Sequence, residues 1–195
     1  HEGPKETLAL TTHTQPVMLV AGVAAYRVWQ AEGGAPPAFV AGHSLGEYSA
    51  LVVSGVLTLA QAVPLVRLRA QAMQDAVAVG AGAMAAVLGL PAARVVEVCA
   101  QAQASFGAGS HEVVQAANFN DPGQTVISGS KLAVDQACEK LKAAGAKRTL
   151  LLPVSAPFHC PLMQPAAERL RAHLADLVLQ PPTIAVINNI DVAQE

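Results

Sequence analysis

A short apolar run at residues 38–41 leads into the sequence Gly-His-Ser-Leu-Gly at residues 42–46, and residues 44–53 are apolar on most sides. The run of four is too short for a helix and is typical of a buried strand, whereas the longer stretch stops at Gly55, as a helix with a glycine cap does. A serine flanked by glycines between a strand and a helix is typical of a nucleophile elbow. We therefore predict an α/β fold with Ser44 at the apex of a sharp turn.

Helices are predicted on both sides of this turn. Residues 15–32 have Pro16 where a first helical turn accepts it, and they should cover one face of a sheet. The apolar positions of that helix recur at helical spacing: Val17, Val20, Ala21, Ala24 and Val28. Thr58 and Gln61 have the spacing of a capping box, so a further helix should run to about Ala76.

The middle of the chain has a different pattern of elements. Strands are predicted at 84–88, 112–118, 125–128 and 148–152, and helices at 92–103 and 132–144. The order βαββαβ folds as a ferredoxin-like layer whose ends emerge side by side, so it fits as an insertion. We expect an α/β core with a mostly parallel sheet at 1–82 and 153–195, and a ferredoxin-like subdomain at 83–152. A helix at 165–177 and a buried strand at 184–187 should belong to the core.

Composition excludes several classes of protein. The chain is 52% apolar with a formal net charge of −2, and it has no basic run for nucleic-acid binding. Its longest apolar stretches, 17–25 and 50–59, are too short to span a bilayer, so a protein with no membrane association is expected. Three widely separated cysteines fit neither a disulfide framework nor a zinc site. With no secretory signal visible at His1, we expect a cytoplasmic location.

A serine nucleophile needs a base, which is usually histidine. The positions of His1, His13, His111 and His173 are typical of solvated side chains. His43 adjoins Ser44, but adjacent side chains diverge at an elbow, so it more readily packs against or orients nearby groups. His159 lies in a proline-fixed loop that presents one side chain rigidly. We predict His159 as general base and acid, with an ordinary loop histidine as the alternative, and the backbone N–H of Leu45 as an oxyanion-hole donor.

Two other features have alternative interpretations. Cys160 adjoins His159 and would make a Cys–His pair, but neighbouring residues of an extended loop point apart and a buried free cysteine is commonly a small hydrophobe. Asn118, Asn120 and Gln124 cluster at a predicted turn, where they either form the turn or line an active site.

Residues 42–51 strongly resemble the malonyl-CoA:acyl-carrier-protein transacylases of fatty-acid synthesis. Three further segments agree in the family's order: 67–69 followed by Met73 and Gln74, 118–124, and 155–160. The resemblance covers essentially the whole chain. It implies a hydrolase-like α/β domain that carries a ferredoxin-like insert, with the active site in the gorge between them.

The same resemblance assigns roles to individual residues. It implies that Ser44 is acylated, that His159 is its partner and that Arg69 binds the malonyl carboxylate. A planar guanidinium suits a carboxylate, and Arg67, two residues earlier, should face elsewhere. Phe158 resembles the bulky residue that narrows the pocket of malonyl-selective relatives against a branched acyl group.

The implied reaction is a ping-pong transfer of malonyl from malonyl-CoA to the phosphopantetheine thiol of acyl carrier protein, through a malonyl ester of Ser44. It needs no permanently bound cofactor and no metal. Because acyl carrier proteins are acidic, Lys142, Lys147 and Arg148 are candidates for docking, or else ordinary solvated side chains.

The chain departs from the family at its ends. The N-terminal Gly-Gln-Gly-x-Gln segment and the C-terminal segment are not found, so we expect the central portion of such an enzyme. One alternative is an α/β-hydrolase-type serine esterase or thioesterase, with Asp121 or Asp135 as the acid of a triad. Another is an inactive fragment core.

Overall fold

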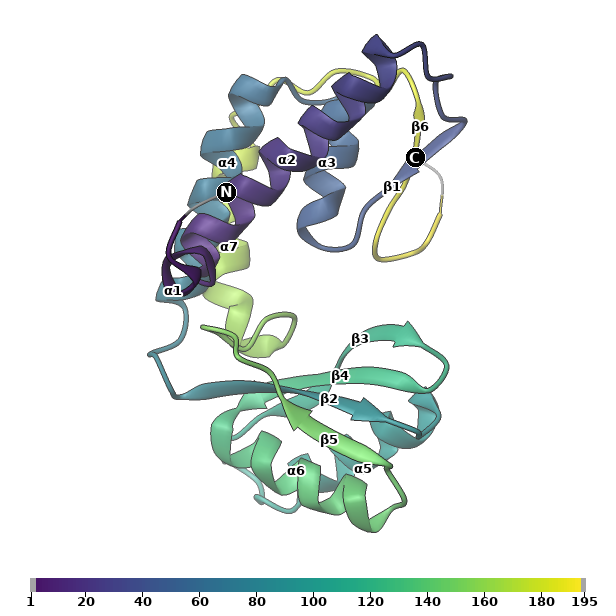
Figure 1. Ribbon diagram of the computed structural model, residues 1–195. Coiled ribbons are helices and arrows are strands. Elements are labelled where there is room, and N and C mark those ends of the chain that lie inside the picture. Colours follow the sequence, from purple (N-terminus) through teal and green to yellow (C-terminus); the bar gives the residue numbers. More distant parts are fainter. Residues whose placement is uncertain (1–2, 194–195) are drawn as a thin grey trace. The chain divides into compact units, whose positions relative to one another are not determined.

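The computed structural model shows an α/β chain (Figure 1). It describes residues 3–193, so His1 lies outside the described residues. The chain divides into two compact units: residues up to Gln71 with those from Leu170 onward, and residues 72–169. Helix α4 (Leu59–Asp75) and helix α7 (Gln164–Leu174) each cross a unit boundary. The second unit extends beyond the expected subdomain at 83–152, because it includes the last turn of α4 and the loop that contains His159.

The first unit contains a parallel strand pair and a cluster of helices. Strand β1 (Phe39–Ala41) pairs in parallel with β6 (Ala185–Ile187), with Val40 opposite Val186. The unit also contains the helices α1 (Lys5–Leu8), α2 (Thr11–Ala31) and α3 (Leu45–Val53), most of α4 and the end of α7. Within the described residues, the expected mostly parallel sheet is represented by this one pair. The prediction of a buried strand holds for Val186, 3% exposed, but is wrong for Phe39, which is 55% exposed.

The predicted buried face of the first long helix is wrong. Helix α2 begins at Thr11, four residues earlier than expected, so Pro16 lies inside it. Its buried positions are Thr11, Gln15, Leu19 and Val23, whereas Val17 and Val28 are more than half exposed. Leu19 and Val23 pack with residues of α3 and α4, and not over a sheet. The sequence misled because α2 is apolar on more than one face, and spacing alone does not select the face that meets a core.

The predicted capping box is confirmed at the start of α4. The Thr58 Oγ1 accepts a hydrogen bond from the Gln61 N–H at 3.2 Å, and the Thr58 N–H donates to Gln61 Oε1 at 2.9 Å. These two bonds satisfy N–H groups that have no partner inside the helix. The helix then runs to Asp75, one residue short of the expected end. No helix in the described part of the chain is long and apolar enough to cross a membrane.

The second unit has the predicted order of strands and helices. The elements are β2 (Gly82–Leu88), α5 (Ala92–Ala104), β3 (Val114–Asp121), β4 (Gln124–Ser130), α6 (Lys131–Ala143) and β5 (Arg148–Leu151). The four strands form an antiparallel sheet in the order β3-β4-β2-β5, and α5 and α6 cover one of its faces (Figure 1). Val87 and Ile127 on that face pack with Val98 of α5 and Leu141 of α6, all at most 2% exposed. This apolar layer stabilises the unit.

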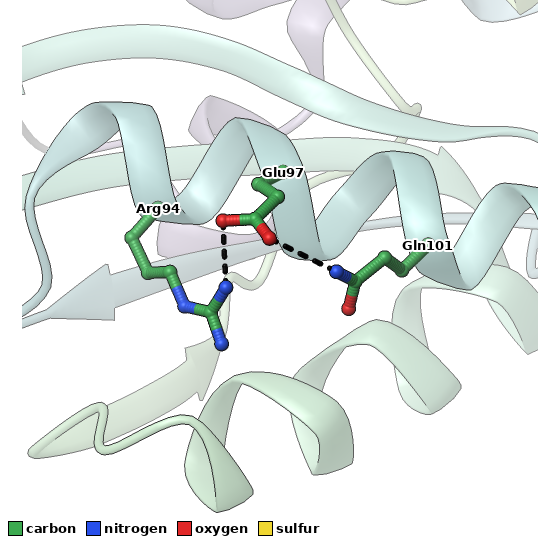
Figure 2. A network of polar contacts seen from close by, with 3 residues as sticks. All are labelled: Arg94, Glu97 and Gln101. Carbon is green, nitrogen blue, oxygen red and sulfur yellow. Dashed lines mark hydrogen bonds and ion pairs between the residues drawn. The ribbon is translucent and has the colours of Figure 1, made fainter.

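The two faces of helix α5 differ, because one is exposed and polar and the other is buried. Its outer face carries an exposed ion pair from Arg94 Nη1 to Glu97 Oε2 at 2.6 Å, and Gln101 Nε2 donates to the same carboxylate at 3.1 Å (Figure 2). Exposed pairs of this kind contribute at most about 1 kcal/mol. On the inner face, burial raises the pKa of the Cys99 thiol to about 12, with a smaller contribution from Cys138. Cys99 is therefore a protonated, packed side chain.

Candidate active site in the first unit and the histidine loop of the second

The predicted elbow is present between β1 and α3. Strand β1 ends at Ala41, helix α3 begins at Leu45, and Ser44 between them has φ 54° and ψ −106°. A positive φ with this ψ is rare for a residue with a side chain and costs on the order of 1–3 kcal/mol. The His43 carbonyl accepts a hydrogen bond from the Gly46 N–H at 2.9 Å, which closes the turn, and the His43 side chain is exposed.

Only the first of the two motif glycines is required by close backbone approach. A Cβ atom added to Gly42 would lie 1.9 Å from the Gly46 carbonyl carbon and 2.2 Å from the Glu47 nitrogen. A Cβ added to Gly46 would have no described atom within 4 Å. The strand therefore reaches the first turn of α3 through the missing side chain of Gly42. Leu45 is the first residue of that turn, and its N–H has no acceptor within the helix.

Arg69 is held against the serine. It is 9% exposed, and its Nη2 donates a hydrogen bond to Ser44 Oγ at 3.0 Å. Its Nη1 donates to Gln15 Oε1 at 2.5 Å. Within the described residues, no carboxylate lies within ion-pair distance of this guanidinium. As expected for two residues of one helix that face different ways, Arg67 is exposed.

Tyr48 forms the apolar side of the Arg69 site. The Arg69 Cζ lies 5.5 Å from the centre of the Tyr48 ring, within the range of a cation–π contact. Burial lowers the pKa of Arg69, and the Tyr48 phenol partly opposes that shift. Burial likewise raises the pKa of Tyr48, against the opposing charge of Arg69. Arginine nevertheless stays charged in proteins, so the site holds a buried positive charge beside Ser44 Oγ.

Gln15 is a site residue that the sequence interpretation missed. It is 6% exposed in α2, and its Nε2 donates to Thr11 Oγ1 at 2.7 Å while its Oε1 accepts from Arg69. Gln15 and Thr11 lie four and eight residues before Leu19, on the same buried face of the helix. In the sequence, Thr11 and Gln15 continue the four-residue spacing of Leu19 and Val23. The sequence interpretation missed this polar pair because it assigned another face of the helix to the core.

The turn after β6 also contacts the elbow. The Ser44 N–H donates a hydrogen bond to Asn189 Oδ1 at 2.9 Å. Asn188 orders this turn, because its Oδ1 accepts from the N–H groups of Ile190 at 3.0 Å and Asp191 at 2.7 Å. Strands β1 and β6 are parallel, so the segments that follow them emerge at the same edge. Sequence reasoning did not identify Asn189, which lies 145 residues from Ser44.

The second unit holds the loop that presents His159. This residue is half-buried and has φ 59°, a left-handed conformation. Its carbonyl oxygen accepts a hydrogen bond from Gln115 Nε2 of β3 at 3.1 Å. Gln74 Nε2 of α4 donates to the carbonyl of Ser155 at 3.3 Å. Pro157 is fully buried and packs on Gly82, where a Cβ would lie 2.3 Å from the proline ring. These contacts hold the loop to the rest of the second unit, and Pro157 provides one of them.

The neighbours of His159 have packing roles. Phe158 is half-buried against two apolar clusters that include Met73 and Met84. Cys160 is 7% exposed, and its Sγ donates to the Pro157 carbonyl at 3.1 Å. Burial raises the pKa of the Cys160 thiol. A thiol that stays protonated is a poor nucleophile, which disfavours the Cys–His alternative.

The remaining candidates lie on the antiparallel sheet and on α6. Asn120 is exposed and is the extra residue of a bulge in β3, between the pairs Phe119–Thr125 and Asp121–Gln124. Asp121 Oδ1 accepts from the Gly123 N–H at 2.9 Å, as a turn-forming residue does.

Asp135 of α6 forms an ion pair with Lys131 Nζ at 2.8 Å. Local contacts therefore account for both aspartates of the hydrolase alternative. In residues 3–193, no group of three or more His, Cys, Asp or Glu side chains is placed to hold a metal ion.

Comparisons with known proteins place this chain in a family. The acyl transferase domain family matches residues 1–195. The malonyl CoA-acyl carrier protein transacylase of Escherichia coli strain K12 is 53% identical over 194 residues, which cover 100% of this chain and 61% of that protein.

Solved structures agree with the sequence match. The acyl-carrier-protein S-malonyltransferase of Burkholderia pseudomallei 1710b is 56% identical with a TM-score of 0.93, over 100% of this chain and 61% of that chain. A malonyl-transacylase solved in complex with a type II PKS acyl-carrier protein is 47% identical with a TM-score of 0.95, over the same shares. The chain therefore spans about 61% of the length of these relatives. On the family match over its whole length, the chain belongs to the acyl transferase domain family.

Proposed function

We propose that this chain carries the transfer of a malonyl group from malonyl-CoA to the phosphopantetheine thiol of acyl carrier protein, through a malonyl ester of Ser44. The observation that carries the proposal is the buried Arg69 guanidinium, 3.0 Å from Ser44 Oγ and bound by neutral partners. The relatives named above as malonyl transacylases support the same assignment.

Arg69 explains why the acyl group should carry a carboxylate. A buried cation without an anion is unfavourable, and a malonyl carboxylate accepts two parallel hydrogen bonds from the guanidinium fork. The malonyl carboxylate is separated from the thioester carbonyl by one methylene group, so an anion bound at Arg69 would place that carbonyl beside Ser44. Acetyl-CoA has no carboxylate and leaves the charge unpaired, which favours malonyl.

In the first half-reaction, Ser44 Oγ forms a bond to the thioester carbonyl carbon while His159 accepts the hydroxyl proton. The Leu45 N–H, at the N-terminus of α3, stabilises the negative charge on the carbonyl oxygen. The carbon–sulfur bond then breaks, and His159 gives its proton to the sulfur of CoA. In the second half-reaction, the carrier thiol gives a proton to His159, its sulfur attacks the ester, and Ser44 Oγ leaves and regains the proton.

We also propose a hydrolase-like core with a ferredoxin-like subdomain, on the basis of the strand arrangement. The elbow at the end of a parallel strand pair supports a hydrolase-like core at 1–82 and 153–195. The antiparallel sheet with strand order β3-β4-β2-β5, covered on one face by two helices, supports a ferredoxin-like subdomain at 83–152.

The accessory roles are proposals too. Phe158 would narrow the acyl pocket, while His43 and Asn120 would contact substrate. Lys147 and Arg148 would help to dock the acidic carrier with Lys142, which is paired with Glu139 at 2.8 Å. Three free cysteines and a CoA substrate fit the cytoplasm, and the chemistry needs no bound cofactor.

A histidine variant tests the proposed mechanism in the full-length natural protein. We expect His159→Ala to lower the rate of malonyl transfer by roughly 10²- to 10⁴-fold, because the serine loses its base. Cys160→Ala, the neighbouring matched control, should keep most of the activity. Initial rates with malonyl-CoA and acyl carrier protein both varied should give parallel double-reciprocal lines. Loss of activity in the cysteine variant with retention in the histidine variant would refute the assignment.

A further inference from the structure

Ser44 is held in its strained conformation by contacts from two directions. The close approach of Gly42 to the first turn of α3 fixes the chain on one side. On the other side, the Ser44 N–H donates to Asn189 Oδ1 at 2.9 Å. Strained backbone conformations persist only where the surroundings determine them. The Asn189 contact is therefore one of the interactions that keep φ of Ser44 at 54°.

The turn that contains Asn189 is ordered by hydrogen bonds of the neighbouring Asn188. Asn188 Oδ1 binds the two N–H groups that follow Asn189, and the Asn188 N–H donates to the Ala193 carbonyl at 2.9 Å. Strand β6, which leads into the turn, is paired with β1, which leads into the elbow. The donor and the acceptor thus lie in the segments that directly follow two adjacent parallel strands, and the pairing of those strands brings the two segments together.

We infer that Asn189 is a positioning residue for the nucleophile, a role that rests on the proposed function of Ser44. Its carboxamide oxygen holds the Ser44 N–H, and so directs Oγ toward the reacting carbonyl and leaves the Leu45 N–H pointing at the developing oxyanion. Without this acceptor the Ser44 backbone relaxes toward ordinary φ values and Oγ moves. A shift of about 1 Å at a reacting group lowers a rate by up to about a hundredfold.

The test uses variants that separate the acceptor from the shape of the side chain. Asn189→Leu keeps the branching and the number of side-chain heavy atoms and removes the acceptor, although its methyl groups are bulkier, whereas Asn189→Asp keeps an acceptor oxygen. Ile190→Ala is the matched control, because Ile190 lies in the same turn with its side chain 90% exposed. Each is made in the full-length natural protein and assayed with malonyl-CoA. Each is also labelled with a serine-directed sulfonyl fluoride, which needs no malonyl group.

We expect Asn189→Leu to slow both Ser44 labelling and the kcat of malonyl transfer by about tenfold to a hundredfold, with KM little changed. Asn189→Asp should label within about threefold of the natural protein. Labelling of Asn189→Leu at the natural rate would overturn the inference, as would equal slowing in the Asp variant.

If the Leu variant does not fold, Asn189→Ala makes the same comparison without added bulk. The labelling result is independent of the acyl donor. If malonyl transfer is absent from the natural protein, the proposed function fails while the role of Asn189 is still measured.

Discussion

Replacing Gly42 with alanine is expected to destroy the elbow and to abolish acylation at Ser44. The added Cβ would lie 1.9 Å from the Gly46 carbonyl carbon and 2.1 Å from its oxygen, both of which are backbone atoms of α3. Backbone in the first turn of a helix does not yield as a side chain does, so the strand and helix must separate. We expect a loss of about 3 kcal/mol or more in the free energy of unfolding, measured by denaturant titration.

Gly46→Ala is the matched control for Gly42→Ala. Nothing in the described residues lies within 4 Å of a Cβ at Gly46, and alanine favours helix more than glycine by up to about 1 kcal/mol. We expect this variant to unfold at the same or a higher denaturant concentration and to keep its acylation activity. Equal damage from both substitutions would mean that close approach at Gly42 does not explain the motif.

Replacing Arg69 with alanine is expected to remove the preference for malonyl. The kcat/KM for malonyl-CoA should fall by roughly 100-fold to 1,000-fold, because the substrate carboxylate loses its buried cation. The rate with acetyl-CoA should change far less, since acetyl makes no ion pair with the guanidinium. Arg69→Lys should recover only part of the malonyl activity, because an ammonium group lacks the planar fork.

Arg67→Ala is the control for charge on the same helix, because Arg67 is exposed. We expect it to leave the ratio of malonyl to acetyl activity unchanged. If Arg69→Ala slows both acyl donors equally, then Arg69 acts through its hydrogen bond to Ser44 Oγ, and its assignment as the carboxylate-binding residue is wrong.

Local signals in the sequence were enough to predict the elements that local contacts form. The capping box of Thr58 and Gln61 joins residues three apart, and the elbow at Ser44 depends on Gly42, two residues before it. The order βαββαβ follows from the periodicity of short segments. In each case the residues whose contacts form the structure are close neighbours in the sequence, so a local pattern contains them.

Features set by distant contacts were missed. Helix α2 is apolar around much of its surface, so only its packing on α3 and α4 shows that Leu19 and Gln15 are buried while Val28 is not. Asn189 contacts Ser44 through the pairing of β1 with β6, which no local pattern contains. The exposure of Phe39 likewise reflects which elements cover the strand, a property of the assembled unit.

Intact-protein mass spectrometry after mixing with malonyl-CoA tests the assignment of Ser44 as an acylated nucleophile most directly. The natural full-length protein should gain the mass of one malonyl group, and peptide mapping should locate it on Ser44. Ser44→Ala, measured beside it and shown to be folded, should gain nothing. A malonyl adduct that persists in Ser44→Ala, or a folded natural protein that forms no adduct, would contradict the proposed function.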